Sequence, residues 1–108
     1  MMIRQPDFVT PDVLEGAIIN VSKKKSLPRF KDVRLESIED GDCVQILHVG
    51  PYDNEPGSFV KVDEFCSAHN LQRANDEWHR EIYLSDARKV EPAKLKTVLR
   101  VQVKSMQF

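Results

Sequence analysis

The 108-residue sequence has little of what marks several large protein classes. No apolar run approaches the roughly 20 residues that a membrane-spanning helix needs, so we expect no membrane span. Sixteen Lys and Arg residues against 17 Asp and Glu leave a net charge of −1, which gives no overall attraction for nucleic acid phosphates. We therefore predict neither a membrane nor directly bound nucleic acid as a partner.

Glycine and cysteine are also scarce. The four glycines stand far apart and form no GxGxxG or phosphate-binding loop. Cys43 and Cys66 lack the CxxC spacing and each lies in an apolar stretch, so we expect two reduced, packed thiols, with a disulfide or metal pair as the alternative. The amino terminus lacks the apolar core of a secretory signal, and the simplest location is therefore cytoplasmic.

Two segments repeat apolar residues at helical spacing. Thr10 followed by Pro11 is a typical helix start, and the pattern after it predicts an amphipathic helix over residues 11–25. The run of three lysines at its end favours the helix dipole, a simpler explanation than a phosphate site. Residues 56–69 place four apolar side chains on one helical face and predict a second helix: Phe59, Val62, Phe65 and Cys66.

Other segments have the patterns of strands. Residues 33–38 alternate apolar and charged side chains, and residues 43–49 are mostly apolar after an acidic turn, which together predicts a β-hairpin. After a polar loop at 70–77, residues 79–86 and 97–103 alternate like further strands. The order of these elements predicts an α+β fold, an antiparallel β-sheet with the two amphipathic helices on one face.

The strand expected at 79–86 contains a carboxylate, although strands are poor in acidic residues. Side chains alternate across a strand, so Ile82 and Leu84 point to one face, while the other face is shared by His79, Glu81, Tyr83 and Ser85. The polar face is either solvated surface or the lining of a cavity where Glu81 meets a ligand or performs acid–base chemistry. A carboxylate in a partly dry cavity can serve as a general acid or base, or can bind a cation.

Several motifs along the chain occur together in one known family. They are VQILHVGPYDNEP at residues 44–56, HREIYLSDARK at 79–89 and PAKLKTVLR at 92–100, preceded by RQPDFVTPD at 4–12. In this order they resemble the carboxyl-terminal half of the GyrI-like small-molecule-binding proteins, and the resemblance covers nearly the whole chain. The LHVGPYD and EIYLSD motifs are similar to those of a branch of hydrolases that open cyclopropane-containing toxins.

The resemblance implies a fold of two strand-helix-strand-strand (SHS2) repeats related by a pseudo-twofold axis. Residues 1–108 are then a single GyrI-like domain, made of the second repeat and the helix before it. The resemblance also implies a ligand cleft with Glu81 at its floor, where cationic or electrophilic organic molecules bind. Family members carry a first repeat with a tryptophan pair as one wall of the cleft, and Trp78 stands in a different place. We therefore expect a homodimer, in which a second copy protects exposed sheet edges.

Four more residues are candidates for the site. Tyr83 can hydrogen-bond a ligand or stack against one, or can simply fill cross-strand space. Tyr52 lies in a loop that suits a rim aromatic, or is an ordinary exposed turn residue. His48 and His79 are further candidate ligand contacts, and with Glu81 they would form a two-histidine, one-carboxylate metal site. Ordinary strand histidines explain the pair more simply, so we predict no metal and no cofactor.

Three functions fit these observations. The first is the binding of small hydrophobic or cationic organic molecules for sensing, sequestration or detoxification. The second is hydrolysis of strained electrophiles such as cyclopropane-containing toxins, with Glu81 activating water and Tyr52 or Tyr83 sharing the acid–base work. The third is a protein-interaction module such as a gyrase modulator. Small-molecule binding is the prediction, and the other two remain alternatives.

Overall fold

The computed structural model describes residues 1–25 and 28–106 of the chain. Contacts divide the chain into two compact units, Met1–Glu39 and Asp40–Phe108, which we describe separately. The organisation of residues 1–108 as a single domain therefore stays a prediction. Within the described residues, no helix has the length and apolar character needed to cross a bilayer.

The first unit contains helix α1 (Pro11–Lys24) and the short 3-10 helix η1 (Pro28–Asp32). The side-chain oxygen of Thr10 accepts a hydrogen bond of 3.3 Å from the backbone N–H of Val13, which caps the start of α1. Lysines occupy the last turn, where their charge favours the helix dipole. These features confirm the helix predicted over residues 11–25.

Residues 33–38 are not a strand, and the hairpin predicted there is wrong. Strand β1 (Cys43–Val49) pairs instead along its whole length with β4 (Lys96–Ser105), about fifty residues later. A strand needs a hydrogen-bonded neighbour, and none of the described strands pairs with residues 33–38. Their alternating apolar side chains are consequently exposed, for example Val33 and Ile38.

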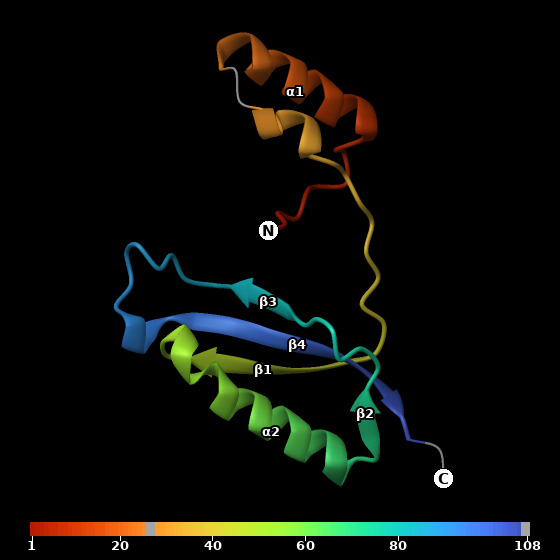
Figure 1. The fold of residues 1–108 in the computed structure, drawn as a ribbon, viewed down its shortest axis with the longest axis vertical. Coiled ribbons are helices and arrows are strands. Elements are labelled where there is room, and N and C mark those ends of the chain that lie inside the picture. The colour runs from red at the N-terminus through yellow and green to blue at the C-terminus, as the bar shows by residue number, and fades with distance from the viewer. Residues whose placement is uncertain (26–27, 107–108) are drawn as a thin grey trace. The chain divides into compact units, whose positions relative to one another are not determined.

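The second unit is built around β4, the central strand of a four-stranded antiparallel sheet. Strand β1 runs along one side of β4, and β2 (Leu71–Arg73) and β3 (Arg80–Tyr83) pair with different parts of its other side (Figure 1). β2 lies within the segment predicted as a polar loop, because three residues are too few to show an alternating pattern. The predicted α+β class with an antiparallel sheet is confirmed.

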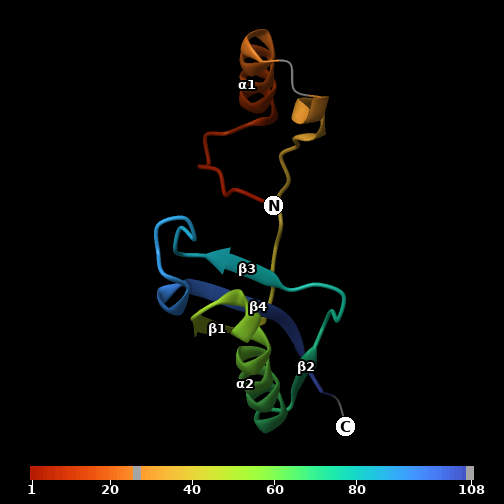
Figure 2. The same cartoon turned by 60° about the vertical axis from the view of Figure 1, so that its left-hand side comes forward.

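Helix α2 (Glu55–Ala68) covers one face of this sheet (Figure 2) and confirms the helix predicted at 56–69. Val62 and Cys66 of α2 are buried against β4, from which Val101 and Val103 point toward the helix. The partly buried residues around them are Val44, Ile46, Phe59 and Leu71. Since α1 belongs to the other unit, the placement of both helices on one face stays a prediction.

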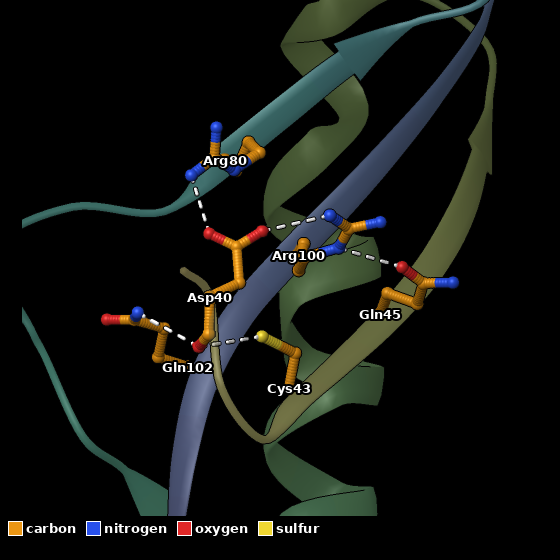
Figure 3. A network of polar contacts seen from close by, with 6 residues as sticks. All are labelled: Asp40, Cys43, Gln45, Arg80, Arg100 and Gln102. Carbon is orange, nitrogen blue, oxygen red and sulfur yellow. Dashed lines mark hydrogen bonds and ion pairs between the residues drawn. The ribbon is translucent and has the colours of Figure 1, made fainter. Parts of the chain in front are cut away.

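On the opposite sheet face, Asp40 links β3 to β4. Its carboxylate lies between Arg80 and Arg100, whose guanidinium groups donate to Oδ1 and Oδ2 respectively (Figure 3). Burial alone would raise the pKa of Asp40, but the two guanidinium groups outweigh it and hold that pKa below its ordinary value. The backbone carbonyl of Asp40 also accepts a hydrogen bond from the Gln102 amide. This network holds β3 against β4 next to the candidate site.

Candidate functional site

The predicted polar face of β3 exists, and Glu81 lies at its centre. Nε2 of His79 lies 2.9 Å from Oε1 of Glu81, and the Tyr83 hydroxyl donates to Oε2 over 2.8 Å. In the sheet register, Glu81 and Tyr83 stand opposite Leu99 and Thr97 of β4, whose buried side chains face α2. The polar face of β3 therefore lies on the helix side of the sheet.

A second carboxyl group, from Glu55, meets Glu81 in this cluster. Glu55 is the first residue of α2 and exposes only 7% of its surface. Among the described residues, no Lys or Arg side chain forms an ion pair with it. Sequence reasoning missed this role of Glu55, because an acid in the first turn of a helix is ordinarily an exposed group that favours the dipole. Glu55, His79 and Glu81 are the residues of the cluster that could ligate a metal.

The two carboxyl groups have different proton affinities. Burial, followed by the hydrogen bond and the charge of Glu81, raises the pKa of Glu55 from 4.5 to about 7. Burial acts in the same direction on Glu81, but hydrogen bonds from His79, Glu55 and Tyr83 outweigh it and leave the pKa of Glu81 below its ordinary value. The hydrogen bond to Glu81 in turn raises the pKa of Tyr83. The pair therefore loses its protons in two steps, in which Glu81 ionises first and Glu55 loses its proton only around pH 7.

Aromatic rings border the carboxylate on two sides. Tyr52 lies in the short helix η2 (Tyr52–Asn54), and its ring meets that of Tyr83 edge to face, with centroids 5.7 Å apart. The two tyrosines expose 41% and 59% of their surfaces, so this pair is open to a ligand. On the other side, the ring of His79 packs against the ring of Phe59 of α2, and the two ring centroids are 4.6 Å apart. The structure therefore brings together four of the candidate site residues: Glu81, Tyr83, Tyr52 and His79.

His48 lies on the same sheet face but is packed inside the unit, with 4% of its surface exposed. Its Nε2 donates to the Pro51 carbonyl over 2.8 Å, since a carbonyl only accepts, and its Nδ1 lies 2.7 Å from the Ser58 hydroxyl. These bonds connect β1, the following loop and α2. His48 therefore positions the start of α2, including Glu55, from within the unit and does not line its open side.

The carboxyl cluster is an open site and not an enclosed cavity. Two hollows of the described residues lie elsewhere: one of about 390 Å³ in the first unit and one of about 310 Å³ between β1 and α2. The second hollow is bordered by Cys43, which is free, as is Cys66 in the adjoining core. Neither hollow includes Glu81. The ligand cleft with Glu81 at its floor therefore stays a prediction.

Comparison with known proteins agrees with this arrangement of one helix on an antiparallel sheet. The model of the GyrI-like small molecule binding domain matches residues 7–104. The chain belongs to the GyrI-like family. The match runs through all the residues of the carboxyl cluster, so the site described above is part of a GyrI-like small-molecule-binding domain.

Solved structures similar to this GyrI-like chain come from Listeria innocua. An uncharacterized conserved protein is 43% identical with a TM-score of 0.88, and two hydrolases are each 41% identical with TM-scores of 0.85 and 0.83. Each similarity covers 94% of this chain but only 50%, 52% and 50% of the respective solved chains. The GyrI-like chain therefore spans about half the length of these relatives. No curated protein matches it in sequence.

Proposed function

We propose that this GyrI-like chain binds small organic cations that carry a flat hydrophobic part, with Glu81 as their counter-charge. The observation that supports the proposal is an ionised carboxylate beside an accessible pair of tyrosine rings. Tyr83 and His79 hold both carboxylate oxygens of Glu81 in place, so little order is lost when a cation binds. Sensing, sequestration and detoxification all require this binding step.

The cluster suits a cation with a single charge. Because Glu55 retains the shared proton below about pH 7, the pair offers one negative charge there, and a monocation neutralises it. The faces of Tyr52 and Tyr83 supply a partner for the flat part of the ligand and an additional attraction for its charge. An uncharged molecule of the same shape would gain only the contact with the rings.

A matched pair of compounds tests this proposal. The probes are the N-methylquinolinium cation and methylnaphthalene, its uncharged isostere. Each compound is titrated with the protein in buffer that contains EDTA, and binding is followed by the fluorescence of the compound. We expect Glu81→Gln to weaken binding of the cation by about tenfold and to leave binding of methylnaphthalene unchanged. Glu64→Gln, an exposed change on α2, is the control and should alter neither. Equal affinity of the native chain for both compounds would contradict the role of Glu81.

Hydrolysis of strained electrophiles, such as cyclopropane-containing toxins, is the second candidate function. Two carboxyl groups of unlike proton affinity favour it, and two of the similar solved proteins are called hydrolases. In this reaction Glu81 would take a proton from water while the water oxygen attacks a ring carbon. The broken ring bond would pass its electron pair to a conjugated carbonyl, which Glu55, Tyr52 or Tyr83 would protonate.

Binding ranks ahead of hydrolysis because a lowered pKa makes Glu81 a weak base, whereas a general base works best with a pKa near the working pH. Incubating the pure chain with a cyclopropane-containing electrophile and detecting the water adduct by mass spectrometry tests the second function. Adduct formation that Glu81→Gln abolishes would support hydrolysis. Formation at the same rate in that variant would remove Glu81 from the reaction.

We also propose that two copies of the chain associate along the outer edge of β3. This strand pairs only with β4 among the described strands, and Tyr83 and Leu84 at its end are more than half exposed. Unpaired strand edges favour association, and a second copy here would close the open side of the carboxyl cluster. The similar solved proteins carry about as much chain again, which could provide such a wall within one molecule.

Light scattering tests the association. We expect twice the chain mass of 12.4 kDa for the native chain, and a shift toward the single mass for Leu84→Asp. Val60→Asp, at an exposed apolar position on α2, is the control and should remain dimeric. A single chain mass for the native protein at about 50 μM would contradict the proposal.

A further inference from the structure

The carboxyl cluster also contains the donor set of a metal site. Glu55, His79 and Glu81 each offer a ligand atom, and these atoms all lie within 4.8 Å of one another. We propose that these three side chains bind a divalent transition-metal ion, for which Zn²⁺ is the representative. The site would use two elements of one unit, the start of α2 and the strand β3 with the residue before it.

The spacing of the donors needs only small side-chain movements to fit an ion. In a tetrahedral zinc site with bonds of about 2.0 Å, neighbouring ligand atoms are about 3.3 Å apart. Nε2 of His79 and Oε1 of Glu81 already lie 2.9 Å apart. Their side chains expose 35% and 25% of their surfaces, which leaves room to adjust, while the buried Glu55 provides a fixed donor.

The environment of Glu55 is an independent reason to expect a cation. The residue is more than nine-tenths buried and its carboxyl group is hydrogen-bonded to a second carboxylate, while no Lys or Arg side chain among the described residues pairs with it. Buried carboxylates are ordinarily paired with a cation, hydrogen-bonded to N–H donors or bound to a metal. A divalent ion between Glu55 and Glu81 would displace the proton that joins the pair and would be attracted by both carboxylates.

Neighbouring groups already orient two of the three donors. The Tyr83 hydroxyl holds Oε2 of Glu81, which leaves Oε1 directed toward His79. The ring of Phe59 packs against the imidazole of His79 and limits its rotation. Contacts of this kind fix ligand orientation in metal sites and contribute to affinity.

The donor types indicate which ions should bind. An imidazole nitrogen with two carboxylate oxygens suits Zn²⁺ and its first-row neighbours, whereas Mg²⁺ prefers oxygen ligands alone and keeps several waters. The sequence led us to consider His48 as the third ligand and to predict no metal. His48 instead uses both ring nitrogens inside the unit, and Glu55 takes the third position in the cluster. Three protein ligands leave a further coordination position for water.

Calorimetry on the full chain tests the proposal. The protein is stripped with EDTA, dialysed and titrated with Zn²⁺, with no organic compound present. We expect saturable one-to-one binding that weakens by at least about tenfold in Glu55→Gln and in His79→Gln. His69→Gln removes another exposed histidine near α2 and should leave the affinity unchanged. A parallel titration with Mg²⁺ should produce no saturable heat.

A spectroscopic measurement excludes misfolding as the cause of any loss. Co²⁺ bound to the native chain should show visible absorption bands of a site with nitrogen and oxygen ligands, and His79→Gln should remove them while circular dichroism stays unchanged. Absence of Zn²⁺ binding in the native chain would overturn the proposal, as would binding that survives His79→Gln or is lost in His69→Gln. Such results would leave the proposed binding of organic cations intact, because that is measured in the presence of EDTA.

Discussion

Replacement of Glu55 by Gln should stabilise the fold at neutral and alkaline pH. The folded chain raises the pKa of Glu55 from 4.5 to about 7, so the folded state holds this proton more tightly than the unfolded state does. Below the lower value Glu55 is protonated in both states and costs nothing. As pH rises between the two values, Glu55 ionises in the unfolded state but keeps its proton in the folded state, so the folded state is increasingly disfavoured, and above the upper value the cost is constant. Gln keeps the shape and polarity of the side chain without the charge.

The size of the effect follows from the displacement of the pKa. Each unit is worth about 1.4 kcal/mol, so the change from 4.5 to about 7 sets an upper limit of ~3 kcal/mol. The start of α2 favours a negative charge by about 0.3–1 kcal/mol, and water near the half-buried Glu81 screens the repulsion. We therefore expect Glu55→Gln to gain about 1–2 kcal/mol at alkaline pH and nothing at acidic pH.

Urea denaturation followed by circular dichroism measures this difference. Native chain and variant are compared between about pH 5 and pH 8 with EDTA present, so that no metal ion contributes. Glu64→Gln, on the exposed face of the same helix, should show no such dependence on pH. A gain that is equal at both ends of the range, or a loss that grows with pH, would refute the reasoning.

Two further predictions concern the frame around the site. Leu99→Ala should cost about 3 kcal/mol of unfolding free energy at any pH, because Leu99 is 0% exposed in the centre of β4; a loss below about 1 kcal/mol in urea denaturation would contradict its place in the core. Asp40→Asn should cost about 1–3 kcal/mol, since it leaves Arg80 and Arg100 facing each other without their carboxylate. This loss of stability should be smaller in high salt, which screens the charges. If Asp40→Asn were as stable as the native chain in low salt, the ion pairs of Asp40 with Arg80 and Arg100 would not stabilise the fold.

The sequence pattern predicted those features of the structure that arise within a single helix or strand. The Thr10 and Pro11 start of α1 is a local hydrogen-bonding feature, and it was confirmed. The alternation in β3 placed His79, Glu81 and Tyr83 on one face, and the hydrogen bonds to Glu81 agree with it. Such features can be recognised because the side chains involved are neighbours in sequence.

The features that the sequence did not indicate depend on distant partners. Residues 33–38 alternate like a strand, but β1 pairs with β4 and none of the described strands pairs with this segment. β2 exists only because the long β4 extends far enough to offer it an edge. Glu55 joins the site because the register of β3 on β4 brings Glu81 beneath the start of α2. In each case the decisive contact spans tens of residues, which periodicity cannot show.

The division of charges across β3 explains why the cluster can accept a cation. Arg80 directly precedes Glu81, yet strand alternation directs its side chain to the opposite face of the sheet, where Asp40 engages it together with Arg100 (Figure 3). The guanidinium group nearest to Glu81 in the sequence is therefore bound to Asp40 on the opposite face of the sheet and does not neutralise Glu81. A shift of β3 by one residue would exchange the two faces and place a positive charge beside Glu55. The observed register instead places two carboxyl groups side by side and directs Arg80 away from them. An organic cation or a metal ion would neutralise the negative charge of this pair.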